Sequence, residues 1–133
     1  MSKKEDYKIK NEKFLTELRQ KEEIHELPCG ILCKVIQHNE DERHPKVNSV
    51  VTVHYTGSLI NGRVFDDSRS RNYPEAFRLR DVITGWQIAL QQMTVGDRWI
   101  IYIPAEMGYG SRTSGPIPGN STLIFDVELL GIA

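Results

Sequence analysis

The sequence predicts an α+β domain in which an antiparallel sheet wraps around one short helix, with a further helix ahead of it. Three observations lead to this prediction. Several segments alternate apolar and polar side chains with the period of two that is typical of half-buried strands. Residues 86–93 have helical spacing instead. Residues 3–26 are highly charged and contain neither Gly nor Pro, which favours a separate helix before the sheet.

The N-terminal segment, residues 1–27, is predicted to form a charged helical extension. Ser2 is a suitable N-cap, and Glu5 lies three residues later, at the spacing of a capping box. Because Pro28 disfavours helical geometry in the residue before it, the helix is expected to end by Leu27. The apolar side chains that share one helical face are Phe14, Leu15 and Leu18.

This short apolar face has two interpretations. It either docks on the chain's own domain or forms the seam of a dimer. A sustained coiled coil needs roughly three heptads or more, and the segment does not contain them. Docking and a monomer are therefore favoured, and a dimeric, chaperone-like isomerase built through this helix is the alternative.

Residues 28–133 are predicted to form a single domain. Val47–Thr56 is a predicted strand because it is rich in β-branched residues. The polar stretch 37–46 is expected to be a loop, and Asn61-Gly62 is expected to be a hairpin turn. Three further segments alternate as strands do: residues 31–36, 99–103 and 123–129.

One short helix and one long loop complete the predicted domain. Four apolar side chains in the helix would share one face: Trp86, Ala89, Leu90 and Met93. Such a helix can cover one face of a twisted sheet. The segment Tyr109–Asn120 is rich in Gly and Pro, and a loop of this length in a compact domain is usually functional.

The composition narrows the classes of function. The chain of 133 residues is 39% hydrophobic and has a formal net charge of −1. This balance argues against nucleic-acid binding and gives no reason to expect a membrane partner. No apolar run is long enough to cross a bilayer, and no signal peptide is visible, so a cytoplasmic location is expected.

The sequence contains two cysteines, Cys29 and Cys33, which are separated by three residues. A thioredoxin-like motif has two intervening residues, and no second Cys/His pair at zinc spacing is present. Structural or incidental thiols are therefore expected, reduced in a cytoplasm. Signatures of phosphate-cradling loops, nucleophile elbows and zinc proteases are also absent from the sequence. We expect no metal and no organic cofactor.

A set of aromatic and aliphatic residues remains at strand ends and turns: Tyr55, Phe65, Trp86, Tyr109, Ile117 and Phe125. Asp66 and Arg71 lie among them in the sequence. The pattern alone favours the core of a small sheet protein, because aromatic residues in strands are usually core residues. The order of the surrounding motifs favours a functional role.

Seven short strings follow one another along the chain: VTVHYTG (51–57), NGRVFDDS (61–68), VITGW (82–86), MTVGD (93–97), GYG (108–110), IPG (117–119) and LIFDVELL (123–130). Each string alone is a weak signal, but their order and intervals together are specific. The succession resembles the FKBP family, the macrolide-binding peptidyl-prolyl isomerases, from about residue 47 to the C-terminus. The resemblance implies an FKBP-like antiparallel sheet wrapped around a short helix, with the active site between them.

The resemblance also implies the roles of individual pocket residues. Trp86 resembles the indole that forms the pocket floor. Val82 and Ile83 resemble the aliphatic rim, and the Ile83 backbone N–H resembles the family's donor to a ligand carbonyl. The residues that resemble the aromatic walls are Tyr55, Phe65 and Phe125.

Four further residues complete the implied site. Tyr109 resembles the tyrosine whose hydroxyl binds the substrate carbonyl, and Ile117 resembles the loop residue that closes over the ring. Asp66 resembles the acidic pocket residue, and Arg71 is its expected charged partner. A plain surface ion pair, which contributes less than about 1 kcal/mol, is the alternative interpretation of that pair.

Glu75 departs from the family pattern. It stands where members with large aromatic pockets carry a Phe, so one pocket wall is expected to be more polar. This difference implies weaker macrolide binding and a preference for substrates with a basic residue nearby.

The implied function is acceleration of rotation about Xaa-Pro bonds in proline-containing polypeptides, by binding the twisted amide in an aromatic pocket. The alternative is an FKBP-fold binding or chaperone module with weak or no isomerase activity. Activity on a peptide substrate separates the two interpretations.

Overall fold

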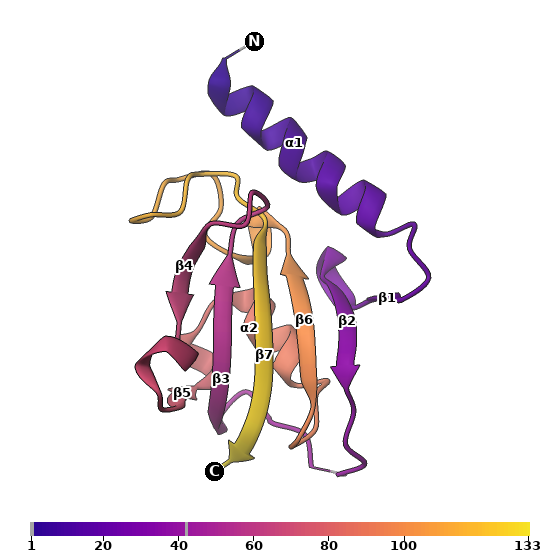
Figure 1. Ribbon diagram of the computed structural model, residues 1–133, viewed down its shortest axis with the longest axis vertical. Coiled ribbons are helices and arrows are strands. Elements are labelled where there is room, and N and C mark those ends of the chain that lie inside the picture. Colours follow the sequence, from indigo (N-terminus) through magenta and orange to yellow (C-terminus); the bar gives the residue numbers. More distant parts are fainter. Residues whose placement is uncertain (1, 42) are drawn as a thin grey trace.

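A seven-stranded antiparallel sheet forms the body of the described structure, a computed structural model that covers residues 2–41 and 43–133 (Figure 1). Met1 of the predicted extension and Glu42 of the predicted loop lie outside the described residues. The strands are β1 (Ile24–Glu26), β2 (Leu32–Gln37), β3 (Val50–Ser58), β4 (Val64–Asp67), β5 (Glu75–Arg78), β6 (Arg98–Ile103) and β7 (Leu123–Ile132). The α-helices are α1 (Lys3–Leu18) and α2 (Thr84–Leu90).

The order of the strands places the chain's last strand at the centre of the sheet. Neighbours run β1-β2-β6-β7-β3-β4, and β5 pairs with the other end of β3. Tyr55 of β3 lies opposite Val127, and Gly57 lies opposite Phe125. Side chains alternate between the two faces of a strand, so this register puts Tyr55 and Phe125 on the same face of the sheet.

The core lies between α2 and one face of the sheet. In β3 the odd-numbered residues Val51 and Val53 are fully buried, as the predicted alternation requires. α2 covers this face (Figure 1). All four apolar residues predicted for the helix are buried, but α2 ends at Leu90, so Met93 lies just after it. The predicted α+β architecture, with a sheet wrapped around one short helix and preceded by an N-terminal helix, is confirmed. The predicted hairpin turn at Asn61-Gly62 joins β3 to β4, and Gly62 has a φ of +88°.

The N-terminal helix is shorter than its predicted limit at Leu27. α1 ends at Leu18, and Ile24–Glu26 forms β1, which the sequence analysis did not predict. Ile24 pairs with Lys34, so β1 supplies hydrogen bonds to the edge of β2. Antiparallel pairing with the nearby strand β2 has overridden the helical propensity of a charged segment that lacks Gly and Pro. The predicted domain boundary at residue 28 consequently falls between two paired strands.

The start of α1 and its packing agree with the sequence analysis. Ser2 caps the helix, and its side-chain oxygen accepts a hydrogen bond from the Glu5 N–H at 3.2 Å. The predicted apolar face docks on the chain's own domain. Its contacts form a small cluster in which Leu15 and Leu18 are buried against Leu32, with Phe14, Ile24 and Tyr102 packed at its edge.

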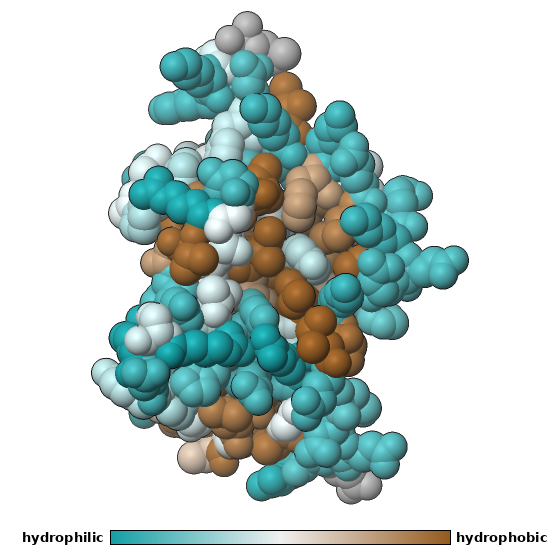
Figure 2. Space-filling model, viewed as in Figure 1, coloured by the Kyte–Doolittle hydropathy of each residue, from teal (hydrophilic) through white to brown (hydrophobic). Residues whose placement is uncertain are grey.

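Hydrophobic residues reach the surface in groups between hydrophilic ones on the face shown in Figure 2. Among the described residues, exposed large hydrophobic side chains include Ile9 on α1 and Val35 and Ile36 in β2. None of the described helices is long and apolar enough to cross a membrane. Both cysteines are free thiols; Cys29 is exposed, and Cys33 is buried in the core.

Candidate active site

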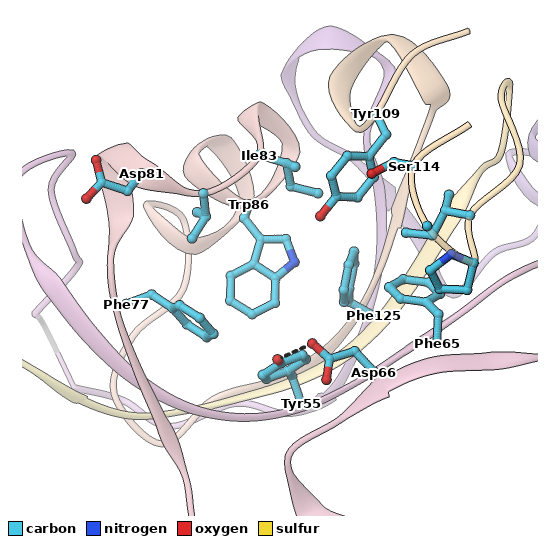
Figure 3. A pocket seen from close by; sticks show the side chains of 14 residues that line it. Tyr55, Phe65, Asp66, Phe77, Asp81, Ile83, Trp86, Tyr109, Ser114 and Phe125 are labelled. Atoms are coloured by element: carbon cyan, nitrogen blue, oxygen red, sulfur yellow. Dashed lines mark hydrogen bonds between the residues drawn. The ribbon is translucent and has the colours of Figure 1, made fainter. Parts of the chain in front are cut away.

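A cavity of about 540 Å³ opens between α2 and the concave face of the sheet (Figure 3). Its lining is mostly aromatic and aliphatic, with few charged groups. The lining residues are Tyr55, Phe65, Asp66, Phe77, Asp81, Val82, Ile83, Trp86, Tyr109, Ser114, Gly115, Pro116, Ile117 and Phe125. The structure therefore brings together nine of the residues predicted for the site, from β3, β4, the segment that leads into α2, α2 itself, β7 and the loop before β7.

Trp86 is the centre of an aromatic cluster. It lies in α2, is only 3% exposed, and packs edge-on against three neighbouring rings. Its ring centroid lies 5.3 Å from Tyr55, 5.3 Å from Phe125 and 5.6 Å from Phe77, with interplanar angles of 86–88°. Such edge-to-face pairs are favourable because the positive edge of one ring meets the negative face of another. The indole thus has the fixed position expected of a pocket floor.

Gly57 makes room for the opposite wall. The rings of Phe65 and Phe125 pack edge-on with centroids 5.6 Å apart. A Cβ at Gly57 would lie 2.7 Å from the Phe65 ring and 2.8 Å from the Phe125 ring. The absence of a side chain at this position of β3 is therefore what allows both rings to approach the strand.

Asp66 links the pocket to a surface ion pair. Its carboxylate accepts a short hydrogen bond from the Tyr55 hydroxyl and lies 3.0 Å from the guanidinium of Arg71. The backbone N–H of Asp67 donates to the same carboxylate at 2.9 Å. This confirms the predicted pairing of Asp66 with Arg71. The pair is more than a plain surface ion pair, because Asp66 also contacts the buried Tyr55.

The contacts of Asp66 shift the pKa values of the group. Partial burial acts to raise the pKa of Asp66, but the hydrogen bonds from Tyr55 and Arg71 outweigh it, so this pKa is lowered. Burial and the hydrogen bond to Asp66 raise the pKa of Tyr55 to about 12. Asp66 is therefore an anion at neutral pH, and Tyr55 keeps its proton and remains a donor.

Arg71 and Glu75 do not line the cavity. Arg71 donates to the Glu75 carboxylate at 3.2 Å and to Asp66 at 3.0 Å, so it bridges the two acidic residues. Glu75 begins β5, while the cavity is lined by Phe77 of the same strand. The predicted roles of Arg71 and Glu75 in substrate binding stay predictions; Arg71 connects Glu75 to Asp66 outside the cavity lining.

Two polar groups can meet a ligand at the edge of the cavity, and a third lies buried in Trp86. Tyr109 is 45% exposed, and its hydroxyl points toward the space above Trp86 (Figure 3). The Ile83 backbone N–H, at the N-cap of α2, donates none of the hydrogen bonds found among the described residues. Trp86 Nε1 is also buried without a partner in the described part of the chain. The site therefore offers unpaired donors within an apolar surface.

Five lining residues were not predicted as site residues. Phe77 is the most important, because its ring packs against both Tyr55 and Trp86. In the sequence, Phe77 could be noticed only as a single aromatic residue in an otherwise polar stretch. In the structure it pairs opposite Val51 of β3, and this pairing turns its side chain toward the core. The others are Asp81, Ser114, Gly115 and Pro116.

The arrangement suits binding and conformational catalysis more than bond making. Among residues 2–41 and 43–133 no group of three or more His, Cys, Asp or Glu could hold a metal ion. Of the two acidic residues that line the cavity, Asp66 is engaged by Tyr55 and Arg71, and Asp81 is largely exposed to solvent. What the pocket offers is a rigid apolar surface with donors at its edge, which can bind a ring and orient carbonyl groups.

The family relationship follows from comparison with known proteins. A family model described as FKBP-type peptidyl-prolyl cis-trans isomerase matches residues 41–130. Outer membrane protein MIP of Legionella longbeachae is 40% identical over 131 residues, covering 98% of this chain and 56% of that protein. FK506-binding protein 1 of Yarrowia lipolytica is 42% identical over 106 residues, covering 77% of this chain and 98% of that protein.

Solved structures give the same result. A crystal structure of a peptidyl-prolyl cis-trans isomerase from Pseudomonas syringae pv. tomato has a TM-score of 0.91 and 32% identity, covering 100% of this chain and 98% of that one. The chain spans only 54–56% of the length of several curated relatives that it matches. The match of the family model, the sequence identity and the common fold together show that this chain belongs to the FKBP-type peptidyl-prolyl cis-trans isomerase family.

Proposed function

We propose that this chain catalyses cis/trans isomerisation of Xaa-Pro bonds in proline-containing polypeptides. The observation that carries the proposal is the cavity of about 540 Å³, in which the buried Trp86 lies beneath two groups able to bind a ligand, the Ile83 N–H and the Tyr109 hydroxyl. A prolyl ring is compact and apolar, so it suits the floor, and the carbonyl groups beside it suit the donors. Because relatives such as the Legionella protein are longer than this chain, activity of the isolated chain is itself part of the proposal.

The reaction needs no bond to be made or broken. Amide resonance imposes a rotation barrier of about 18–20 kcal/mol, and uncatalysed exchange takes roughly 10–100 s. A catalyst has to bind the twisted amide better than either planar form. Twisting removes resonance and reduces charge separation across the amide, so an apolar cleft favours the twisted state relative to water. A thousandfold acceleration requires about 4 kcal/mol of this differential binding.

Each part of the pocket has a role in this mechanism. The prolyl ring would lie over Trp86, whose position is held by its edge-on neighbours. The Ile83 N–H would bind one substrate carbonyl, and the Tyr109 hydroxyl would bind another. Tyr55 is held by Asp66, so it acts mainly as a wall of fixed orientation.

Macrolide binding, location and oligomeric state are finer parts of the proposal. The largely apolar cavity supports binding of macrolide inhibitors, since small-molecule sites are mostly apolar surfaces with a few polar groups. A monomer is supported by the docking of the apolar face of α1 on its own domain. The expected cytoplasmic location stays a proposal to be tested by fractionation, since one relative is named as an outer membrane protein.

The experiment is proline-limited refolding of a protein substrate, followed by fluorescence with and without the chain. We expect the parent to accelerate the slow phase and Tyr109→Phe to reduce that acceleration by about tenfold, because one hydrogen bond to the reacting amide is lost. The matched control is Tyr73→Phe, which removes a hydroxyl from an exposed tyrosine outside the cavity lining. A parent that binds the unfolded substrate without changing the slow phase would instead support a binding module.

A further inference from the structure

The N-terminal helix contacts the loop that carries Tyr109 and Ile117, the two lining residues of this loop that the sequence predicted. This loop, residues 109–122, runs from Tyr109 to the start of β7, and α1 lies over the same end of the sheet (Figure 1). The Tyr7 hydroxyl and the Ser121 hydroxyl are hydrogen-bonded at 2.7 Å. The Asn11 side-chain oxygen accepts a hydrogen bond from the Thr122 N–H at 2.7 Å. Two turns of α1 are thus joined to the C-terminal end of the loop.

Asn11 is unusual for a residue on a charged surface helix. It is only 2% exposed, and both ends of its amide are paired. Its nitrogen donates to the Tyr7 carbonyl at 2.8 Å, which fixes the direction of the oxygen that receives the Thr122 N–H. A buried polar side chain with both hydrogen-bonding ends satisfied holds its partners in one geometry.

The contact continues from α1 into the pocket through short hydrogen bonds. The Ser121 hydroxyl donates to the Pro118 carbonyl at 2.6 Å, and Pro118 follows Ile117, which lines the cavity. The Asn120 N–H donates to the Gly110 carbonyl at 2.8 Å, and Gly110 follows Tyr109. Tyr109 and Ile117 therefore each precede a residue whose carbonyl accepts a hydrogen bond from the segment 120–121, which α1 holds.

The loop has little regular structure of its own to hold it. Within residues 109–122 the only pairing of strand type is an isolated bridge between Ser114 and Ile117. Three of its residues have a positive φ: Gly110, Gly115 and Asn120. The first and last parts of the loop pack closely against each other at Gly119. A Cβ at this position would lie 2.1 Å from the Ser111 carbonyl oxygen. A displacement of the last part of the loop consequently displaces the first part as well.

We propose that Asn11 and Tyr7 are positioning residues, through which α1 holds the 109–122 loop so that Tyr109 and Ile117 face the substrate. The inference rests on the proposed isomerase function and gives the N-terminal helix a part in it. Without these contacts the substrate itself must order the loop. Ordering a mobile segment on binding weakens apparent affinity, so KM rises while kcat changes little.

The test compares Asn11→Ala and Tyr7→Phe with the parent. Thr16→Ala is the matched control, because it also removes a polar group from α1, where the Thr16 hydroxyl bonds only to the Glu12 carbonyl within the helix. Amide hydrogen exchange of the loop and of β3 is measured for each variant, together with KM and kcat on an Xaa-Pro peptide. Tyr7→Phe is the milder variant and keeps the test decisive where Asn11→Ala fails to fold.

In Asn11→Ala we expect amide exchange at Ile117 and Asn120 to accelerate about tenfold, which is the equivalent of about 1.4 kcal/mol. We expect KM to rise about fivefold, with β3 exchange and kcat close to the parent. Tyr7→Phe should show the same pattern at about half that size, and Thr16→Ala should show none of it.

The inference would be overturned by loop exchange no faster than in Thr16→Ala, or by faster loop exchange with an unchanged KM. Uniform acceleration of exchange in β3 and in the loop, with a fall in kcat alone, would also overturn it, because general destabilisation reduces the active fraction. Failure of the proposed isomerase function would give a different result. The parent itself would then be inactive, and amide exchange in the loop would still show whether α1 holds the loop.

Discussion

The hydrogen bond between Tyr55 and Asp66 is the most informative place to perturb this pocket. Tyr55 is only 5% exposed, and its hydroxyl donates to a carboxylate that also pairs with Arg71. Replacing Asp66 with Ala removes the acceptor and leaves the hydroxyl at the wall of an apolar cavity. The same change removes one of the two acidic partners of Arg71, which keeps its contact with Glu75.

The expected loss of stability has two contributions. A hydrogen bond to a charged acceptor contributes about 1.5–3 kcal/mol. The ion pair with Arg71 adds less than about 1 kcal/mol, because the side chains of Asp66 and Arg71 are 41% and 38% exposed. We therefore expect Asp66→Ala to lower the free energy of unfolding by about 2–3 kcal/mol, seen as a fall of about 1 M in the urea midpoint.

Urea unfolding of a double-mutant cycle is the assay. Tyr55→Phe and Asp66→Ala should together cost less than the sum of the single changes, with a coupling of about 1.5 kcal/mol or more. Asp81→Ala is the matched control, since this carboxylate also lines the cavity but is 69% exposed and lies 4.0 Å from Arg80. A loss below about 0.5 kcal/mol for Asp66→Ala, or strictly additive effects, would refute the reasoning.

The pH dependence gives an independent check on the same group. The folded-state pKa of Asp66 is lowered relative to the usual value of 3.8. Its contribution to stability is therefore fully present above about pH 4 and is lost as the pH falls through the lowered value. The difference in unfolding free energy between the parent and Asp66→Ala should shrink below pH 4. A difference that stays constant down to pH 2.5 contradicts this assignment.

Three further outcomes are expected from the pocket and the core. Gly57→Ala places a Cβ 2.7 Å from the Phe65 ring, so it should cost about 1–3 kcal/mol in thermal unfolding and lower isomerase activity; parent-like values for both would contradict the proposed wall. Burial raises the pKa of the Cys33 thiol to about 11, so a thiol reagent at pH 8 should modify only Cys29 rapidly in the folded chain and both thiols in urea. On a series of peptides, Glu75→Gln should reduce any preference for a basic residue before proline by a few-fold. An unchanged preference would show that Glu75 does not determine the substrate specificity.

Much of the fold could be predicted because, in most strands and helices, the local sequence pattern agrees with the tertiary structure. Val47–Thr56 alternates as a strand, and β3 occupies most of that range with its odd-numbered residues buried. Disagreement occurs where pairing decides the structure. Ile24–Glu26 has the composition of a charged helix, but the open edge of β2 recruits it as β1. The short strand β5 was missed because four residues carry too little alternation to be recognised.

The candidate site shows a similar division. Sequential motifs led to the pocket residues of β3, β4, α2 and β7, because each motif carries its own strand or helix signal. Phe77 was missed as a site residue because its role depends on pairing with β3, which is a long-range property. Glu75 was expected in a pocket wall, and its partner Arg71 draws it into an ion pair outside the lining. The contact of α1 with the 109–122 loop also depends on residues more than 100 positions apart, which no local pattern reveals.

The central claim is that this pocket favours the twisted amide, and equilibrium exchange measured by NMR tests it most directly. A short Xaa-Pro peptide is mixed with a substoichiometric amount of the parent chain, and cis-to-trans and trans-to-cis rates are measured together with the two populations. We expect both rates to increase at least a hundredfold above the uncatalysed value of roughly 0.01–0.1 per second, with unchanged populations. Peptide binding at Trp86 with unchanged exchange rates would contradict the claim and leave a binding module of the same fold.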